Sequence, residues 1–467
     1  MNLNKLFAAQ DMTVGPPWKR ITEFAVPMLI GNLAQQLYST VDTIVVGKYV
    51  GDLALSAVGS AGPILNLMLA LFVGVSTGAG IVVSQYYGAK DREGLAKTIG
   101  NCLTLSLIAS LLTMIVGPLA TRPLLELLST PESIIDWCQS YLTIFFLGAA
   151  GFTFYNILSG ILRGMGDSLS ALAFLLLSTV LNIGLDIWFV AGFHMGVPGV
   201  SLATILAQML SAVFCYLKLI HMKSVFELKK SDLALTRVHA MRIIRLGVPS
   251  GITQAIFSVS MLVVQSLTNS MGELVIACNV IVMRVDGFAM MPNMTFGNAL
   301  GVYAGQNVGA GKPKRVHEGA KQGGILAAAT SAVITLVLLF FGKNLMYLFT
   351  DTEELIALSI RMLRILAVGY IAVSVSQVLG GIMRGAGDTV SPMWIGLFTT
   401  VALRLPLAYG LAYLTRCPEY PNGSPEALFG SLLITWVMGM VIHCVVYRIG
   451  PWKKCLPAET NKEEIRN

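Results

Sequence analysis

The residues of this sequence that most clearly could carry out chemistry are acids that lie inside apolar segments. Asp42 falls within an apolar stretch near residues 22–46, and Asp186 falls within another near residues 169–191. A charge in hydrocarbon is costly unless it is paired or faces a polar cavity. Two buried carboxylates also repel each other unless a cation or a proton lies between them. We therefore expect Asp42 and Asp186 to form a cation or proton site, and oxygen ligands would suit Na+.

Neutral polar residues accompany these acids at helical spacing, which places each set on one face of its helix. Hydrogen bonding between helices is the alternative role for the neutral members, but the two carboxylates favour the ion site. The three polar stripes are Asn32, Gln35, Tyr38 and Asp42; Ser178, Asn182 and Asp186; and Thr204, Gln208 and Ser211.

The second half of the chain has a different charge balance. Arg284, Asp286 and Arg404 are ionisable residues of this half that lie inside apolar segments. Two cations and one anion most simply form a local ion pair near a helix end, and the alternative is that they line a central cavity. The methionines near them would suit either packing or a cavity for varied ligands. The cavity candidates of this half are Gln254, Ser258, Arg284, Asp286 and Gln377.

The composition shows which elements must position these residues. Of 467 residues, 55% are hydrophobic and 12% are charged, whereas about a quarter are charged in a soluble domain. A helix of about 20 apolar residues crosses the hydrocarbon core. We therefore predict an all-α integral membrane protein with twelve transmembrane helices, near residues 22–46, 54–81, 98–117, 139–158, 169–191, 198–220, 246–268, 275–303, 322–342, 357–380, 391–414 and 427–447.

The basic residues predict the topology. Most of the 32 Lys and Arg residues fall on the side that holds both termini, and positively charged loops stay cytoplasmic. The net charge of +7 is thus explained by topology and anionic lipids, and we expect no nucleic-acid partner. The seven cysteines form no C-x-x-C pair, so neither a disulfide framework nor a zinc site is indicated.

Two segments recur at a spacing of 221 residues. LSGILRGMGDSLS from Leu158 returns as LGGIMRGAGDTVS from Leu379, and SQYYGAKD from Ser84 returns as GQNVGAGK from Gly305. The chain is therefore a tandem duplication of six helices, and both halves enter the membrane in the same orientation. We expect an N-lobe at 1–220, a cytoplasmic linker at 221–245 and a C-lobe at 246–467.

The repeated Arg-Gly-x-Gly-Asp segment is interpreted as a turn between two helices. Glycines permit a tight reversal, and Asp167 and Asp388 lie where an N-cap would begin the next helix. The Gln-x-x-Gly-Ala loops are interpreted as structural in the same way. The chain carries no H-E-x-x-H or G-x-x-x-x-G-K-[ST] sequence, and its G-x-S-x-G match at Gly74–Gly78 lies inside the apolar segment 54–81. We therefore expect neither an enzyme nor a cofactor. The energy would come from an ion gradient.

Taken together, the twelve helices in two halves, VDTIVVGKYVG after a first helix that contains Pro27, the paired turns and loops, and LNIGLDIWF followed by GVPGVSLAT resemble the multidrug and toxic compound extrusion (MATE) family. The resemblance implies a V-shaped antiporter of the inner membrane that exports cationic amphipathic compounds in exchange for Na+ or H+. It also implies that Gln35 and Tyr38 sense the occupancy of an N-lobe site, and that this site comprises Asp42, Asn182, Asp186 and Thr204.

One departure from the family places the coupling site in the N-lobe. A branch of the family uses carboxylates in helices seven and ten, where this chain has Gln254 and Gln377. We expect ion binding to bend the first helix at Pro27, which lacks a backbone donor. The expected partners are small cationic molecules and lipids, and the protein should be a monomer.

Three other functions are alternatives to export. The first rival is a lipid-linked oligosaccharide flippase, but fourteen helices and a more cationic cavity would be usual there. A membrane-embedded enzyme lacks a catalytic constellation, and a sensor or assembly protein would have no obvious use for two matching halves.

Overall fold

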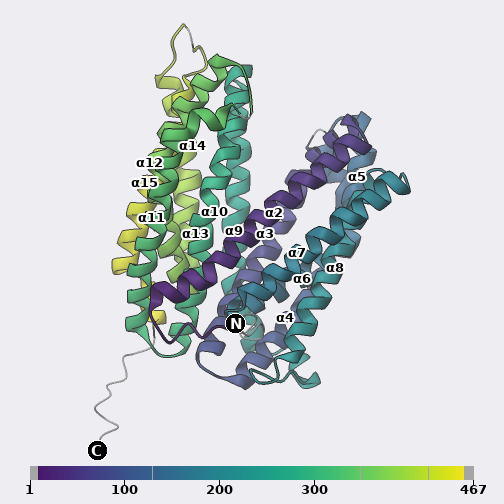
Figure 1. Cartoon of the computed structure of the whole chain (residues 1–467), viewed down its shortest axis with the longest axis vertical. Coiled ribbons are helices and arrows are strands. Elements are labelled where there is room, and N and C mark those ends of the chain that lie inside the picture. The colour runs from purple at the N-terminus through teal and green to yellow at the C-terminus, as the bar shows by residue number, and fades with distance from the viewer. Residues whose placement is uncertain (1–8, 129, 348, 419, 457–467) are drawn as a thin grey trace, which may run out of the picture. The chain divides into compact units, whose positions relative to one another are not determined.

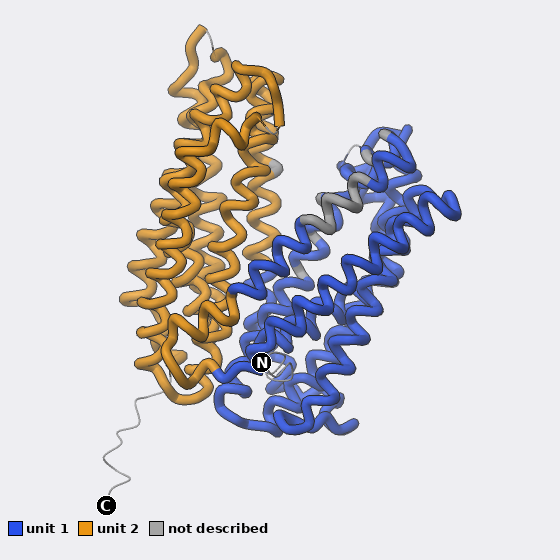
Figure 2. The backbone as a smooth tube through the Cα atoms, in the orientation of Figure 1, with its two compact units in different colours: residues 1–11, 26–251 blue, residues 12–25, 252–467 orange. Residues whose placement is uncertain are grey.

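The computed structural model describes residues 9–128, 130–347, 349–418 and 420–456. It does not describe the side chains of residues 37–44, 52, 55, 63, 67, 71 and 262. By packing, the chain divides into two compact units, shown in Figure 2. Unit 1 comprises 1–11 and 26–251, and unit 2 comprises 12–25 and 252–467.

The helices of the first half begin with α2, which starts in unit 2 and continues into unit 1. In chain order they are α2 (Pro17–Tyr49), α3 (Asp52–Gly88), α4 (Arg92–Leu127), α5 (Glu132–Leu147), α6 (Ala149–Gly164), α7 (Ser168–Asp186) with its π-helical continuation η1 (Ile187–Gly192), α8 (Val197–His221) and the short 3-10 helix η2 (Lys230–Leu233). In unit 1, α6 packs against α3, α4 and α8, and α7 packs against α8.

The helices of the second half begin with α9, which starts in unit 1 and continues into unit 2. They are α9 (Arg237–Asn269), α10 (Glu273–Gly309), α11 (Pro313–Met346), α12 (Glu353–Ala386), α13 (Val390–Leu397), the π-helical η3 (Phe398–Leu403), α14 (Arg404–Leu414), α15 (Pro425–Ile449) and the 3-10 helix η4 (Pro451–Cys455). In unit 2, α12 packs against α10, α11 and α15 (Figure 1).

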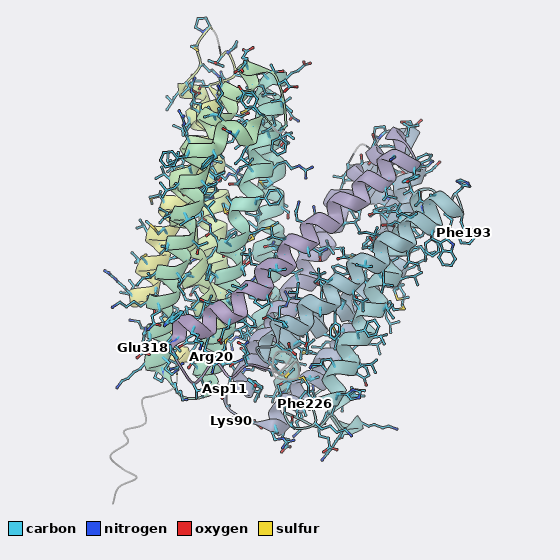
Figure 3. The ribbon with its side chains drawn as sticks, in the orientation of Figure 1. Asp11, Arg20, Lys90, Phe193, Phe226 and Glu318 are labelled. Atoms are coloured by element: carbon cyan, nitrogen blue, oxygen red, sulfur yellow. The ribbon has the colours of Figure 1, made fainter. Side chains whose placement is uncertain are left out.

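Each of the twelve predicted spans corresponds to a helix or to a broken helix. Within the described part of the chain, ten helices are long and apolar enough to cross a membrane, and a bent pair brings the total to eleven. The predicted α-helical membrane architecture is confirmed. In unit 1 the loops around Lys90 and Phe226, both expected to be cytoplasmic, share one end, and Phe193 lies at the other end (Figure 3).

The predicted continuous span at 139–158 differs from the structure. Here α5 and α6 meet at Gly148 and are bent by 53° relative to one another. A methyl group at Gly148 would lie 2.3 Å from the side chain of Ile205 on α8. The break therefore occurs where a third helix approaches closely, a contact that local sequence does not reveal.

The two glycines of each Arg-Gly-x-Gly-Asp turn have different roles. Gly166 and Gly387 adopt φ values of 86° and 108°, which side chains other than glycine rarely adopt. Gly164 and Gly385 instead allow helices to approach. A methyl group at Gly164 would lie 2.6 Å from the carbonyl oxygen of Gly80, and one at Gly385 would lie 2.1 Å from that of Gly301. The motif therefore brings α6 against α3 and α12 against α10.

Asp167 is the N-cap residue of α7, as predicted, whereas Asp388 lies one residue before Thr389, the N-cap residue of α13, and bonds to the first turn of that helix. The Oδ1 atom of Asp167 accepts a hydrogen bond of 2.9 Å from the backbone N–H of Ser170. The equivalent atom of Asp388 accepts one of 2.9 Å from the backbone N–H of Ser391. Each carboxylate satisfies a backbone donor that a helix start leaves without a partner.

Candidate functional site

The polar stripes of α7 and α8 are buried in unit 1. Asn182 and Asp186 have no exposed surface, and Ser178 is 2% exposed. On α8, Thr204 and Gln208 are 7% and 6% exposed. The spacing of four residues on α7 places its three polar side chains on the face that packs against α8. A buried carboxylate thus lies on a helix face that otherwise presents amide and hydroxyl groups.

One hydrogen bond joins the two stripes directly. The Nδ2 group of Asn182 donates to Oγ1 of Thr204 over 3.4 Å, which is long for a hydrogen bond. The Oδ1 atom of Asn182 and the Oε1 atom of Gln208 are buried without a hydrogen-bond partner among the described residues. Such oxygens create a negative potential that a cation or a proton donor would satisfy.

Another hydrogen bond joins α7 and α8. Ser211 on α8 donates a hydrogen bond of 3.2 Å to the carbonyl oxygen of Phe174 on α7. This contact fits the expectation that neutral polar side chains join membrane helices. The stripe on α8 therefore has a structural member, Ser211, beside residues that face Asn182.

The predicted ion site and its surroundings also include side chains of α2. The side chains of Asp42 and Tyr38 on α2 lie outside the described residues. The meeting of Asp42 with Asp186 stays a prediction. In the part of the chain that the structure describes, no group of three His, Cys, Asp or Glu residues could hold a metal ion. The predicted donor set is of another kind, because it contains two carboxylates, an amide and a hydroxyl.

Asn32 and Gln35 line a polar pocket of about 140 Å3 in unit 1. Pro27 on α2 and Arg163 on α6 contribute to the same wall. The guanidinium of Arg163 is held by Ser159, whose Oγ accepts a hydrogen bond of 3.0 Å from Nη2. The sequence predicts only a turn role for Arg163, although its recurrence as Arg384 signals a special position.

The candidates of unit 2 separate into two groups. Asp286 and Gln377 line a second pocket, of about 190 Å3, together with Arg404. Gln254 and Arg284 are exposed, and the hydroxyl of Ser258 donates to the carbonyl oxygen of Gln254. Thr400, Trp436 and His443 are among the lining residues that the sequence did not single out. A histidine inside the predicted span at 427–447 was the available signal.

Comparison with known proteins assigns the class. The MatE family model matches residues 27–188 and again residues 249–410. The two matches agree with the tandem repeat and cover most of the chain. The chain belongs to the MatE family, and it is a multi-pass membrane protein of a transporter family.

Named relatives share this length and architecture. The Bacillus subtilis (strain 168) protein named "Probable multidrug resistance protein YpnP" is 32% identical over 85% of this chain and 89% of its own length. "Probable multidrug resistance protein YoeA" of the same organism is 27% identical over 90% and 92%. "Probable multidrug resistance protein NorM" of Thermotoga maritima is 25% identical over 84% and 85%.

Solved structures show the same twelve-helix fold. One titled as the outward-facing conformation of a multidrug resistance MATE family transporter matches with a TM-score of 0.88 at 24% identity, over 96% of this chain and 99% of that one. A MOP superfamily transporter from Pyrococcus furiosus matches with a TM-score of 0.86 at 24% identity, over 94% and 96%. At this identity the likeness establishes the fold.

Proposed function

We propose that this protein is a secondary active multidrug efflux antiporter of the inner membrane, which exports cationic amphipathic compounds in exchange for Na+ or H+. Its family and the names of its relatives support export of drugs. The observation that carries ion coupling is the full burial of Asp186 and Asn182 on the face of α7 that packs against α8. A buried carboxylate inside a membrane protein costs free energy, and such residues usually belong to ion or proton pathways.

The coupling ion would bind to Asp186, Asn182 and Thr204 of unit 1, with Asp42 of α2 as the fourth ligand. Carboxylate, amide and hydroxyl oxygens are ligands for hard cations. A proton shared between the two carboxylates would neutralise the same site. The oxygen of Asn182 that has no partner among the described residues supports either occupant.

Movement of α2 would connect this site to the cargo. Pro27 lies within α2 and removes one backbone hydrogen bond, so bending there is cheap. Bending would narrow the pocket that Pro27, Asn32 and Gln35 line. Alternating access requires ion and cargo to prefer different conformations, because a ligand with equal affinity for both states shifts nothing. We place both termini in the cytoplasm and expect a monomer.

Uptake of a cationic dye by everted vesicles tests this function. A sodium gradient and a pH gradient are imposed separately, and the gradient that drives accumulation identifies the ion. Asp186→Asn and Asp42→Asn should each abolish driven uptake at unchanged expression, whereas the exposed Asp351→Asn should not. Driven uptake that survives both substitutions would exclude this coupling mechanism.

A further inference from the structure

The pocket of unit 2 is built from six elements and contains two buried charges. Asp286 of α10 is 7% exposed and Arg404 of α14 is 5% exposed, and both line it. The remaining walls come from α9, α12, α15 and η3. Charges at this depth are kept only where a partner or a ligand compensates them.

The two charges attract one another but leave hydrogen-bonding capacity unused. Arg404 interacts electrostatically with Asp286. The hydroxyl of Tyr370 on α12 also interacts with the carboxyl group of Asp286. Nevertheless, Oδ1 of Asp286 and Nε of Arg404 are buried without a hydrogen bond of standard geometry among the described residues. A closed bidentate ion pair would use these atoms. The pocket therefore offers a carboxylate acceptor and a guanidinium donor, and each can take one more group.

The backbone directly before Arg404 is irregular. The segment η3 (Phe398–Leu403) is π-helical and ends directly before Arg404. Short π-helical turns inside α-helices occur frequently at functional sites. Thr399 and Thr400 of this segment line the pocket, and Ser260 of α9 donates a hydrogen bond of 3.1 Å to the carbonyl oxygen of Thr400. The irregular turn thus brings Arg404, Thr399 and Thr400 to the same pocket.

The rest of the wall suits an apolar body. Met261, Met290 and Trp436 line the pocket beside the charges. Thioethers adapt to varied shapes, and an indole face accepts aromatic or cationic groups. The pocket therefore combines an adaptable apolar wall with a fixed pair of opposite charges.

This charge pair discriminates between ligand classes. A simple cation that approaches Asp286 meets the field of Arg404, and it also meets that of Arg384, which acts on the lining residue His443. A simple anion at Arg404 meets the field of Asp286. A molecule with both an ammonium and a carboxylate satisfies both residues at once, and it leaves neither charge uncompensated.

We propose that this pocket binds amphipathic zwitterions, with the ammonium group at Asp286 and the carboxylate at Arg404. The inference rests on the proposed export function and refines its cargo. It extends the expected cationic substrates to molecules that also carry an acid. Gln377, which lines the same pocket, is placed to add a neutral hydrogen bond.

A matched ligand series tests the proposal on the full-length protein in nanodiscs, by calorimetric titration without any ion gradient. The probes are 2-naphthylalanine, 2-(2-naphthyl)ethylamine, which lacks the carboxylate, and 3-(2-naphthyl)propionic acid, which lacks the ammonium. The amino acid should bind about tenfold more tightly than either analogue, because each loses one charged hydrogen bond. Binding of the amine as tight as that of the amino acid would overturn the proposal.

Charge-neutralising variants give an independent result. Asp286→Asn should make the acid the preferred ligand over the amine, Arg404→Gln should make the amine preferred, and the double variant should show no charge preference. The double variant leaves no uncompensated charge, so it provides a folded comparison if a single variant is unstable. An unchanged order of affinities in all variants would contradict the assignment.

The proposed coupling site provides the control that separates the two hypotheses. Asp186→Asn in unit 1 should abolish driven transport and leave the order of these three affinities unchanged. If wild type shows normal driven transport but no preference for the zwitterion, the proposed zwitterion site is rejected and the efflux function is not. Intact preference without any driven transport in wild type would reject the efflux function alone.

Discussion

Gln306 on α10 accepts a hydrogen bond of 2.9 Å from the backbone N–H of Met12. Arg315 and Lys312 donate further hydrogen bonds to carbonyl oxygens of the same segment, at Met12, Thr13 and Gly15. These contacts bind residues 12–25 to unit 2, although the helix they begin continues into unit 1 (Figure 2). The glutamine of the second Gln-x-x-Gly-Ala loop thus holds the start of the first helix.

The first Gln-x-x-Gly-Ala loop makes a related contact in unit 1, to a side chain instead of a backbone N–H. Gln85 accepts a hydrogen bond of 2.5 Å from Nη2 of Arg242, near the start of α9. Gln85 and Gln306 occupy equivalent positions of the repeat. Each half therefore holds the beginning of the first helix of the other half, and Pro27 and Pro249 lie within a few residues of the points where these helices change unit.

This reciprocity predicts a selective effect on hydrogen exchange. Gln306→Ala removes the acceptor of a buried N–H, which costs about 1–3 kcal/mol, so residues 12–25 should exchange faster by about tenfold. Gln85→Ala should accelerate exchange at the start of α9 and leave residues 12–25 unchanged. Mass spectrometry of both variants provides the measurement. The exposed Gln254→Ala is the control, and equal exchange in all three variants would show that the glutamines do not hold these segments.

The close helix pairs predict which glycines tolerate a methyl group. Gly385→Ala should lower thermal stability strongly, because its methyl group would meet the carbonyl oxygen of Gly301 at 2.1 Å. Overpacking of this kind costs about 1–3 kcal/mol. Gly430→Ala in α15 meets nothing within 4 Å and should be neutral or stabilising. Melting temperatures in detergent compare the two, and a melting temperature of Gly385→Ala no lower than that of Gly430→Ala would contradict the packing role.

The span pattern was predictable because hydrocarbon thickness imposes a minimum apolar length on every crossing helix. The helix ends were less predictable. The span at 98–117 is part of α4, which runs from Arg92 to Leu127 and begins where Asp91 accepts a hydrogen bond from the backbone N–H of Gly94. Polar first and last turns continue a helix beyond the hydrocarbon, and hydropathy does not detect them.

The polar face of α7 and the pocket of unit 2 differ in how far the sequence could predict them. Spacing alone placed Asn182 and Asp186 on one face of α7, because both lie on a regular helix. The pocket of unit 2 is assembled from several helices, and Arg404 follows the π-helical η3. A π-helical turn changes the direction of the side chains that follow it, so regular helical spacing could not place Arg404 beside Asp286.

Asp167 predicts a dependence of stability on pH. Burial raises the pKa of Asp167 above its ordinary value, and the hydrogen bonds from Ser170 oppose this only in part. The folded state therefore holds the proton more tightly than the unfolded chain. The stabilising contribution is complete below the ordinary pKa of an aspartate, and it is lost as the pH rises through the raised folded value.

Asp167→Asn keeps a capping oxygen and removes this titration. The melting temperature of Asp167→Asn minus that of wild type should be larger at pH 8 than at pH 4. Asp167→Ala should be destabilised at both pH values by about 1 kcal/mol, because the N-cap is lost. Parallel thermal unfolding of the three proteins measures this, and a difference between Asp167→Asn and wild type that is independent of pH would refute the titration.

Thr204 provides the finest test of the proposed ion site. Its hydroxyl lies 3.4 Å from Nδ2 of Asn182 and would supply one oxygen to the coupling ion. Thr204→Ser keeps this oxygen, whereas Thr204→Val has nearly the same shape without it. The valine variant should need about a tenfold higher concentration of the driving ion for half-maximal dye uptake, because a hydrogen bond or ligand to a charged group is lost. The serine variant should stay close to wild type. If the two variants respond equally to the driving ion, Thr204 contributes only packing, and the ion must be held by the remaining residues of α7 and α2.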